Sequence, residues 1–363
     1  MTNKRVFRLR ATRSVAKSLN CVLRLSVLLS LLSASACQQR PVAVTATPPY
    51  IPDRGNLAVR CGALIDGLSD HVTHGRVLLI REGRIVHIGN RDAAIPADLP
   101  LLDLGAYTCL PGLINTHVHF DALAEDAVDY GVYYRRTRDD HRTLALEVAK
   151  TTLGTGFTTV RNVGAWFPDA IYHARERIRS GDAVGPRIRT AGPYLTIPGG
   201  GGDLTFPEIP TEKIPAESQS GIASTPEGFA DRARDAIEQG ADFLKVIASG
   251  AVFSVGADPG APEMTEADIA AVVNVAHAAG VKVTAHVHSA QSARDAIRAG
   301  VDSIEHASLL DDEAIALAAE NNVALSMDIY NGSYTDTVGR AQGYPEVFLQ
   351  RNHDTTEAQR VVF

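Results

Sequence analysis

A short apolar stretch that ends in two histidines, His117 and His119, constrains this chain more than any other feature. The stretch begins at Leu113 directly after Pro111-Gly112, a pattern typical of a buried β-strand that follows a turn. Because side chains alternate along a strand, both imidazoles are expected on the same side. Neutral imidazole is the commonest side-chain metal ligand, so the pair predicts a metal site at a strand end. For the pair alone, two structural histidines near a turn are the alternative.

After His119 the pattern changes to apolar runs that alternate with helical stretches, which is typical of a parallel sheet with crossover helices. Further strands are expected at 157–163, 188–192, 242–247, 281–286, 303–306 and 323–327. Helices are expected at 226–239, 265–279, 290–299, 311–320 and 352–363. Gly240, Gly280 and Gly300 each follow a helical stretch, as C-terminal caps do. The long segment 193–225 includes four consecutive glycines, which favour a sharp turn or a close approach of backbone to a ligand.

Residues 56–110 have a different pattern, which predicts a small antiparallel β module. Its expected strands are 57–65, 77–81 and 85–88, separated by glycine-containing turns such as the one at Glu82-Gly83. Two cysteines, Cys61 and Cys109, lie in this part of the chain. Two separate buried thiols are the favoured interpretation, and export would also permit a disulfide between them.

The amino terminus has the composition of an export signal. Residues 1–36 carry seven Lys and Arg and no acidic residue, and the apolar run 25–32 is too short to span a bilayer. Small residues lead into Cys37, which resembles a bacterial lipoprotein signal in which Cys37 is lipidated. The protein is therefore expected to be a periplasmic lipoprotein that meets the membrane only through a lipid anchor, with residues 37–55 as a linker. A plain cleaved secretory signal is the alternative.

Charge argues against one class of partner. Removing the leader takes the formal net charge from −7 to −14, which leaves no basic stripe for a phosphate backbone. Nucleic acid is thus excluded as an expected partner, a small molecule or dipeptide is favoured as substrate, and homo-oligomer formation stays open.

The candidate site residues lie on the expected strands, most of them at the carboxyl ends where barrel enzymes build their active sites. His117 and His119 end the first strand, Lys245 lies in the fourth, His286 ends the fifth and His306 ends the sixth. One histidine in such a place is usually structural. Convergence of four histidines and a lysine from four strands predicts a site.

The chain resembles the amidohydrolase superfamily, in the branch of the imidazolonepropionase-like and Xaa-Pro dipeptidase-like enzymes. The resemblance rests on Leu110-Pro111-Gly112 before His117-Val118-His119, and on Asp242-Phe243-Leu244-Lys245-Val246, Ala285-His286-Val287-His288 and Ile304-Glu305-His306. It implies an α/β fold in which a small β-sandwich accompanies a TIM-type (β/α)8 barrel, here residues 111–363. It also implies two divalent metals, with zinc as the expected ion, held by His117, His119, His286 and His306 and bridged by a carbamylated Lys245.

Burial explains why a lysine suits that role, because it disfavours the ammonium, and the neutral amine can take up carbon dioxide to become an anionic oxygen ligand. A buried Lys245 paired with Asp242 or Glu263 is the alternative.

Further candidates have weaker signals. His288 lies past the expected strand end and would contact substrate or be exposed, and Glu305 is expected to support His306. Arg161 would hold a substrate carboxylate or form a structural salt bridge. Tyr194 and Asp328, after the third and seventh strands, complete the candidate substrate-binding set.

The implied function is hydrolysis of a C–N bond of a small substrate, such as an Xaa-Pro or N-acyl amino acid, by a metal-bridging hydroxide. After the seventh strand only one further helix is expected, so the eighth barrel strand, its Asp and the last sandwich strands are expected to be missing. A poorly active or inactive protein follows from that expectation. The alternative function is a truncated exported fragment that binds metal without turnover.

Overall fold

The computed structural model describes residues 55–205, 209–254, 256–329 and 331–363, and its contacts divide the chain into two compact units after Cys109. The expected signal and Cys37 lie outside the described residues. Within the described ranges, no helix is long and apolar enough to cross a membrane.

The first unit is a four-stranded sheet with the order β3-β2-β1-β4. Its strands are β1 (Leu57–Leu64), β2 (Thr73–Arg81), β3 (Arg84–Asn90) and β4 (Leu101–Cys109). The turn between β2 and β3 has positive φ at both Glu82 and Gly83, the geometry of a tight hairpin. The prediction of an antiparallel module is wrong in one respect, because β1 pairs with β4 in parallel. A parallel pair needs a long connection, and here β2 and β3 supply it.

The prediction of two separate thiols is also wrong, because Cys61 and Cys109 form a disulfide with their Cα atoms 5.8 Å apart. Cys61 is in β1 and Cys109 ends β4, and the register between these strands shifts after Cys61. That shift brings the two cysteines within reach. The bond lies in one of the two small cores of this unit, with Leu64 and Leu78.

The second unit alternates strands with helices, as expected. Its strands are β5 (Leu113–Val118), β6 (Phe157–Asn162), β7 (Arg187–Thr190), β8 (Tyr194–Leu195), β9 (Phe243–Ile247), β10 (Lys282–Ser289), β11 (Ser303–Leu309) and β12 (Ala324–Ser326). Its α-helices are α2 (Val132–Arg135), α3 (Arg138–Gly154), α4 (Pro168–Ser180), α5 (Pro226–Glu238), α6 (Glu266–Ala278), α7 (Ala290–Ala299), α8 (Asp312–Glu320), α9 (Asn331–Tyr334), α10 (Arg340–Gln342) and α11 (Glu346–Val362). Short turns η1 (Ala124–Val128), η2 (Thr211–Lys213), η3 (Ala216–Gln219) and η4 (Thr335–Gly339) complete it.

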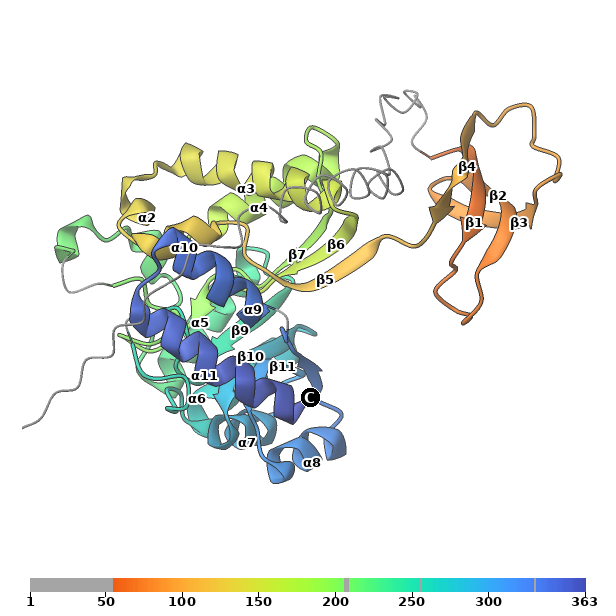
Figure 1. Ribbon diagram of the computed structural model, residues 1–363. Coiled ribbons are helices and arrows are strands. Elements are labelled where there is room, and N and C mark those ends of the chain that lie inside the picture. Colours follow the sequence, from red (N-terminus) through yellow and green to blue (C-terminus); the bar gives the residue numbers. More distant parts are fainter. Residues whose placement is uncertain (1–54, 206–208, 255, 330) are drawn as a thin grey trace, which may run out of the picture. The chain divides into compact units, whose positions relative to one another are not determined.

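All strand pairs of this unit are parallel and follow chain order, which is the arrangement of a (β/α) barrel. The third barrel strand is in two pieces, because β7 pairs with β6 whereas β8 pairs with β9. In the described residues β5 pairs only with β6 and β12 only with β11, and the hydroxyl oxygens of Thr116 and Ser326 lie 3.0 Å apart between these two outer strands. Helices α5 to α8 pack side by side on the outside of β9, β10 and β11 (Figure 1).

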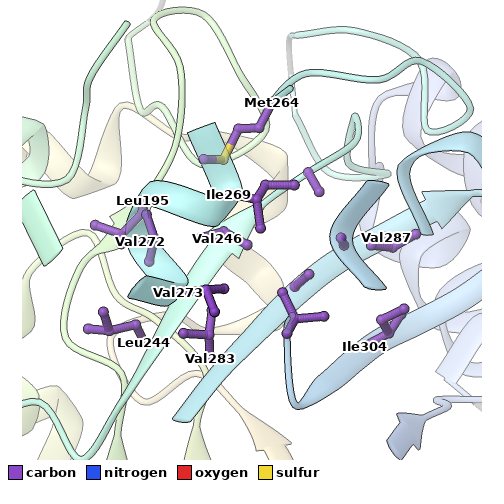
Figure 2. Packing of buried hydrophobic residues seen from close by; sticks show 14 of the residues in the cluster. Leu195, Leu244, Val246, Met264, Ile269, Val272, Val273, Val283, Val287 and Ile304 are labelled. Carbon is purple, nitrogen blue, oxygen red and sulfur yellow. The ribbon is translucent and has the colours of Figure 1, made fainter. Parts of the chain in front are cut away.

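Local sequence explains where these helices begin and end. Helices α5 to α8 each start after a residue whose side chain accepts a hydrogen bond from a first-turn backbone N–H, namely Thr225, Thr265, Ser289 and Asp311. Gly240, Gly280 and Gly300 have positive φ at the helix ends, as predicted. The main core packs branched apolar side chains of β9, β10 and β11 against α6 and α7, and Figure 2 shows Val246, Val283, Ile304 and Ile269 among them.

The largest departures from the sequence-based expectations are at the ends of β10 and β11 and around α11. Strand β10 continues to Ser289 and β11 to Leu309, so both strands are three residues longer than predicted at their carboxyl ends. The segment after β12 contains α9, η4 and α10, none of which was predicted. Helix α11 begins at Glu346 rather than at residue 352, because Gly343 in the left-handed region ends α10 and Pro345 precedes the new helix.

Candidate metal centre

The second unit brings all four predicted histidine ligands together at the carboxyl ends of β5, β10 and β11. Ring centroids of His117 and His119 are 5.2 Å apart, those of His117 and His306 4.7 Å, and those of His286 and His306 4.5 Å. His286, His288 and His306 can also present one ring nitrogen each within 4.8 Å of one another. Burial lowers the pKa of His117 to about 3 and that of His119 to about 4, so both imidazoles are neutral, as a metal ligand must be.

Glu305 fixes the ring of His117. Its carboxylate is fully buried and accepts a hydrogen bond from Nδ1 of His117 at 2.8 Å, which leaves Nε2 with a free lone pair. The same carboxylate accepts from Thr284 Oγ1 at 2.5 Å and from the guanidinium of Arg161. The expectation that Glu305 supports His306 is therefore wrong. Glu305 reaches across to β5 instead, and the ring of His306 also lies next to His117, because the positive φ of His306 interrupts the alternation of side chains along β11.

His119 is oriented by the end of the second barrel strand. Its Nδ1 donates to the carbonyl of Gly164 at 3.1 Å and lies 2.8 Å from the hydroxyl of Tyr194. Gly164 has φ of 112°, and a Cβ there would lie 2.4 Å from the ring of Tyr194. Only glycine therefore lets the Gly164 carbonyl and the Tyr194 ring approach His119 together.

His306 is held by the predicted substrate-binding residue Asp328. Nδ1 of His306 donates to Asp328 Oδ2 at 3.2 Å, which again leaves Nε2 free. His306 has φ of 69° and Ala307 has φ of 54°, so two consecutive non-glycine residues adopt the left-handed region. Such strain clusters at functional sites.

The two histidines of β10 both point into the site. His286 Nε2 donates to the carbonyl of Gly250 at 3.3 Å, and Nδ1 of His288 lies 2.9 Å from Ser308 Oγ. The expectation that His288 lies beyond the strand end is wrong, because β10 includes it and its side chain is buried. Its ring stacks on that of His306 at a centroid distance of 4.9 Å.

Lys245 lies in β9 and is almost completely buried. Burial lowers its pKa to about 8, even though the charge of Glu305 acts in the opposite direction. The two carboxylates proposed as alternative partners bind elsewhere. Asp242 accepts from Arg175 and Arg189, and Glu263 accepts from the backbone N–H of Gly201.

The guanidinium N–H groups of Arg161 form hydrogen bonds within the protein. Its guanidinium binds Glu305, the carbonyl of Thr116 at 2.8 Å and Ser303 Oγ at 3.3 Å, which is the structural salt bridge considered as the alternative. A catalytic or substrate-binding role for Arg161 stays a prediction. The same holds for Tyr194, whose hydroxyl is next to His119.

Two residues at the site were missed by sequence reasoning. Asp121 is fully buried, and its Oδ2 accepts from the backbone N–H of Trp166 at 2.8 Å. Its Oδ1 has no hydrogen-bond partner among the described residues, and burial raises the pKa of Asp121 to about 6. Asp121 lies in the turn that follows β5, so no strand periodicity marks it. Gln359 contacts both His306 and Asp328 from α11, and no local pattern marks it.

A parallel (β/α) barrel with buried histidines and a lysine gathered at its strand ends is the architecture of a class of hydrolases. The chain belongs to the amidohydrolase family, whose model matches residues 108–343. The family assignment and the TIM-type fold predicted from the sequence are thereby confirmed.

Several known proteins are similar to this chain. The ochratoxinase of Aspergillus niger is 25% identical over 310 residues, which cover 79% of this chain and 60% of the relative. A solved Xaa-Pro dipeptidase with methionine in its active site is 30% identical, with a TM-score of 0.74, and the match covers 85% of this chain and 75% of that one. A prolidase in complex with N-methylphosphonate-L-proline is 25% identical, with a TM-score of 0.75 and coverage of 85% and 74%. The chain thus spans about 60% of the length of the curated relative.

Proposed function

We propose that this chain acts as a metal-dependent amidohydrolase on an amide or peptide C–N bond of a small substrate, such as an Xaa-Pro dipeptide or an N-acyl amino acid. The observation that carries the proposal is the convergence of four imidazoles, each with one ring nitrogen within hydrogen-bond distance of a protein group. The similar proteins named as Xaa-Pro dipeptidase and prolidase support the substrate class.

The residues present fit a pair of divalent ions, which we propose to be zinc. His117, His119, His286 and His306 offer neutral nitrogen donors, the ligands that zinc prefers along with thiolate and carboxylate. Lys245 adds a buried amine whose lowered pKa favours the neutral form. We propose that this amine is carbamylated, because an unmodified ammonium beside two cations would be repelled.

Bound divalent ions would supply the Lewis acidity that polarises a scissile carbonyl and lowers the pKa of water in the site. The residues of the chain hold this site in shape. Glu305 and the Gly164 carbonyl fix the rings of His117 and His119. The Tyr194 hydroxyl and the His288 ring are the polar groups next to the ligands that we propose to contact the substrate.

The first experiment measures metal content and turnover together. The purified full chain is loaded with zinc, its metal content is measured by elemental analysis, and Xaa-Pro and N-acyl amino acid substrates are assayed. His117→Ala and His306→Ala should each lose zinc and reduce turnover by more than about 100-fold. The control is His277→Ala, since His277 is exposed and its ring nitrogen pairs with Asp302, away from the site. Metal binding without turnover would favour the non-catalytic alternative, and the absence of both would contradict the proposal.

The second experiment tests Lys245. Lys245→Ala should lose activity and regain part of it with added short-chain carboxylic acids, because a free carboxylate can replace the carbamate. NMR after incubation with isotopically labelled bicarbonate should detect the carbamate in the wild type and not in the variant. The exposed Lys282, on the neighbouring strand, is the matched control as Lys282→Ala. Full activity and metal content in Lys245→Ala would contradict the bridging role.

A further inference from the structure

Helix α11 reaches the metal centre through one side chain, Gln359. This residue is 3% exposed, and its Nε2 donates to Asp328 Oδ1 at 2.8 Å and to the backbone carbonyl of His306 at 2.6 Å. Asp328 in turn accepts from Nδ1 of His306 through its other oxygen. The amide of Gln359 therefore holds His306 in two ways. It binds the backbone carbonyl of His306 directly, and it binds the Asp328 carboxylate that accepts from the His306 ring.

The backbone of His306 needs such support. His306 and Ala307 both have positive φ, a conformation that L-residues avoid because Cβ approaches the carbonyl oxygen. The register of β10 and β11 shifts at this point, between Val287 and Ser289. A hydrogen bond to the His306 carbonyl holds the chain where the regular sheet pairing is interrupted.

Helix α11 is itself fixed to the strand-end loops. Arg351 donates to the carbonyls of Ser254 and Gly256, at 2.8 Å and 3.2 Å, in the loop after β9. Phe348 is buried against Phe253, with ring centroids 5.8 Å apart. In Figure 1 the helix runs alongside β11, and the contacts between the two are extensive. The helix that carries Gln359 is thus fixed to the loop after β9 at Phe348 and Arg351.

We infer that Gln359 is a positioning residue that fixes His306 as a metal ligand, through Asp328 and through the His306 carbonyl. The inference rests on the proposed function, in which His306 binds metal. Without the amide, Asp328 loses a donor that holds its carboxylate in place, and the His306 ring can turn away from the site. Partners of metal-ligating histidines typically contribute about 10–100-fold to metal affinity.

The test compares zinc affinities of full-chain variants by competition with a chromophoric chelator, after removal of bound metal. Gln359→Leu removes both donors at similar size, and Gln359→Met does so with an unbranched side chain. Gln350→Ala is the matched control, because Gln350 is exposed on the same helix and donates to Asp354 four residues on. Both Gln359 variants should bind zinc about 10–100-fold more weakly than the wild type, whereas the control stays within twofold. The ligand-field spectrum of the cobalt-loaded protein should change in the Gln359 variants only.

The outcomes separate this inference from the proposed function. A wild type that binds no zinc contradicts the proposed function. A wild type that binds zinc while Gln359→Leu and Gln359→Met stay within twofold of it, with unchanged cobalt spectra, overturns the positioning role alone. If both variants lose cooperative unfolding in the metal-free state, Gln359 serves folding and the positioning role is again wrong.

Discussion

Glu305, on β11, accepts a hydrogen bond from Nδ1 of His117, on β5, although the two residues lie 188 positions apart in the chain. This pair sets the tautomer of a metal-ligand candidate from a carboxylate that no solvent reaches. Arg161 and Thr284 bind the same carboxylate. Against the effect of burial, the hydrogen bond from His117 and the charges of Lys245 and Arg161 hold the pKa of Glu305 well below its usual range. The ring of His117 is therefore held by a buried anionic group rather than by packing alone.

Replacing this carboxylate should weaken the site without changing the ligands. In Glu305→Gln the amide cannot accept from His117 and Arg161 as two carboxylate oxygens do, so zinc affinity should fall about 10–100-fold. The half-buried Arg161 loses its counter-charge, and the free energy of unfolding should fall by up to about 3–5 kcal/mol. Chelator competition and urea unfolding measure the two effects. Glu313→Gln, at an exposed carboxylate near Arg294, is the control. Equal zinc affinity in both variants would show that Glu305 does not orient His117.

The Cys61–Cys109 disulfide should stabilise the first unit. It closes a loop with a sequence separation of 48 residues, for which loop-closure entropy gives about 4 kcal/mol. Urea unfolding with and without a reducing agent measures the difference, and Cys61→Ser with Cys109→Ser should abolish it. Labelling of thiols under denaturing conditions checks the bond directly. Two free thiols in protein purified without a reducing agent would contradict the disulfide.

Glu263 should make stability depend on pH near neutrality. Burial raises its pKa from 4.5 to about 7, against the effect of the hydrogen bond from Gly201. Between these values the folded protein binds the proton more tightly than the unfolded chain, so the contribution of Glu263 to stability falls as pH rises from about 4.5 to 7. The slope of that contribution is at most about 1.4 kcal/mol per pH unit. Glu263→Gln should remove it, whereas the exposed Glu266→Gln should not. Parallel pH profiles for wild type and Glu263→Gln would refute the effect.

The lipid anchor stays a prediction from sequence, because Cys37 lies outside the described residues. Cys37→Ser should release the protein from the membrane fraction, because the thiol that would carry the lipid chains is then absent. Cys21→Ser, within the same leader, should leave the distribution unchanged. Membrane fractionation measures the distribution of each variant, and mass spectrometry identifies the mature amino terminus and any lipid on it. An unlipidated terminus at another residue would favour the plain secretory signal.

Much of the fold and most of the metal-ligand candidates followed from the sequence because they depend on neighbours in the chain. Alternation along a strand is a property of backbone stereochemistry, so His117 and His119 were expected to share a side. Helix caps such as Gly300 depend on φ preferences of single residues. The family resemblance carried by these local motifs was confirmed by the match to residues 108–343.

Tertiary structure alone decided which distant residues meet. The parallel pairing of β1 with β4 and its register shift brought Cys61 to Cys109, and the order of the barrel strands brought Glu305 to His117 rather than to His306. Gln359 reaches His306 only because α11 packs along β11. These contacts depend on strand register and helix packing, which the whole core sets through many weak apolar contacts. A local pattern contains no information about the residue on the far side of such a core, and the sequence therefore left these partners open.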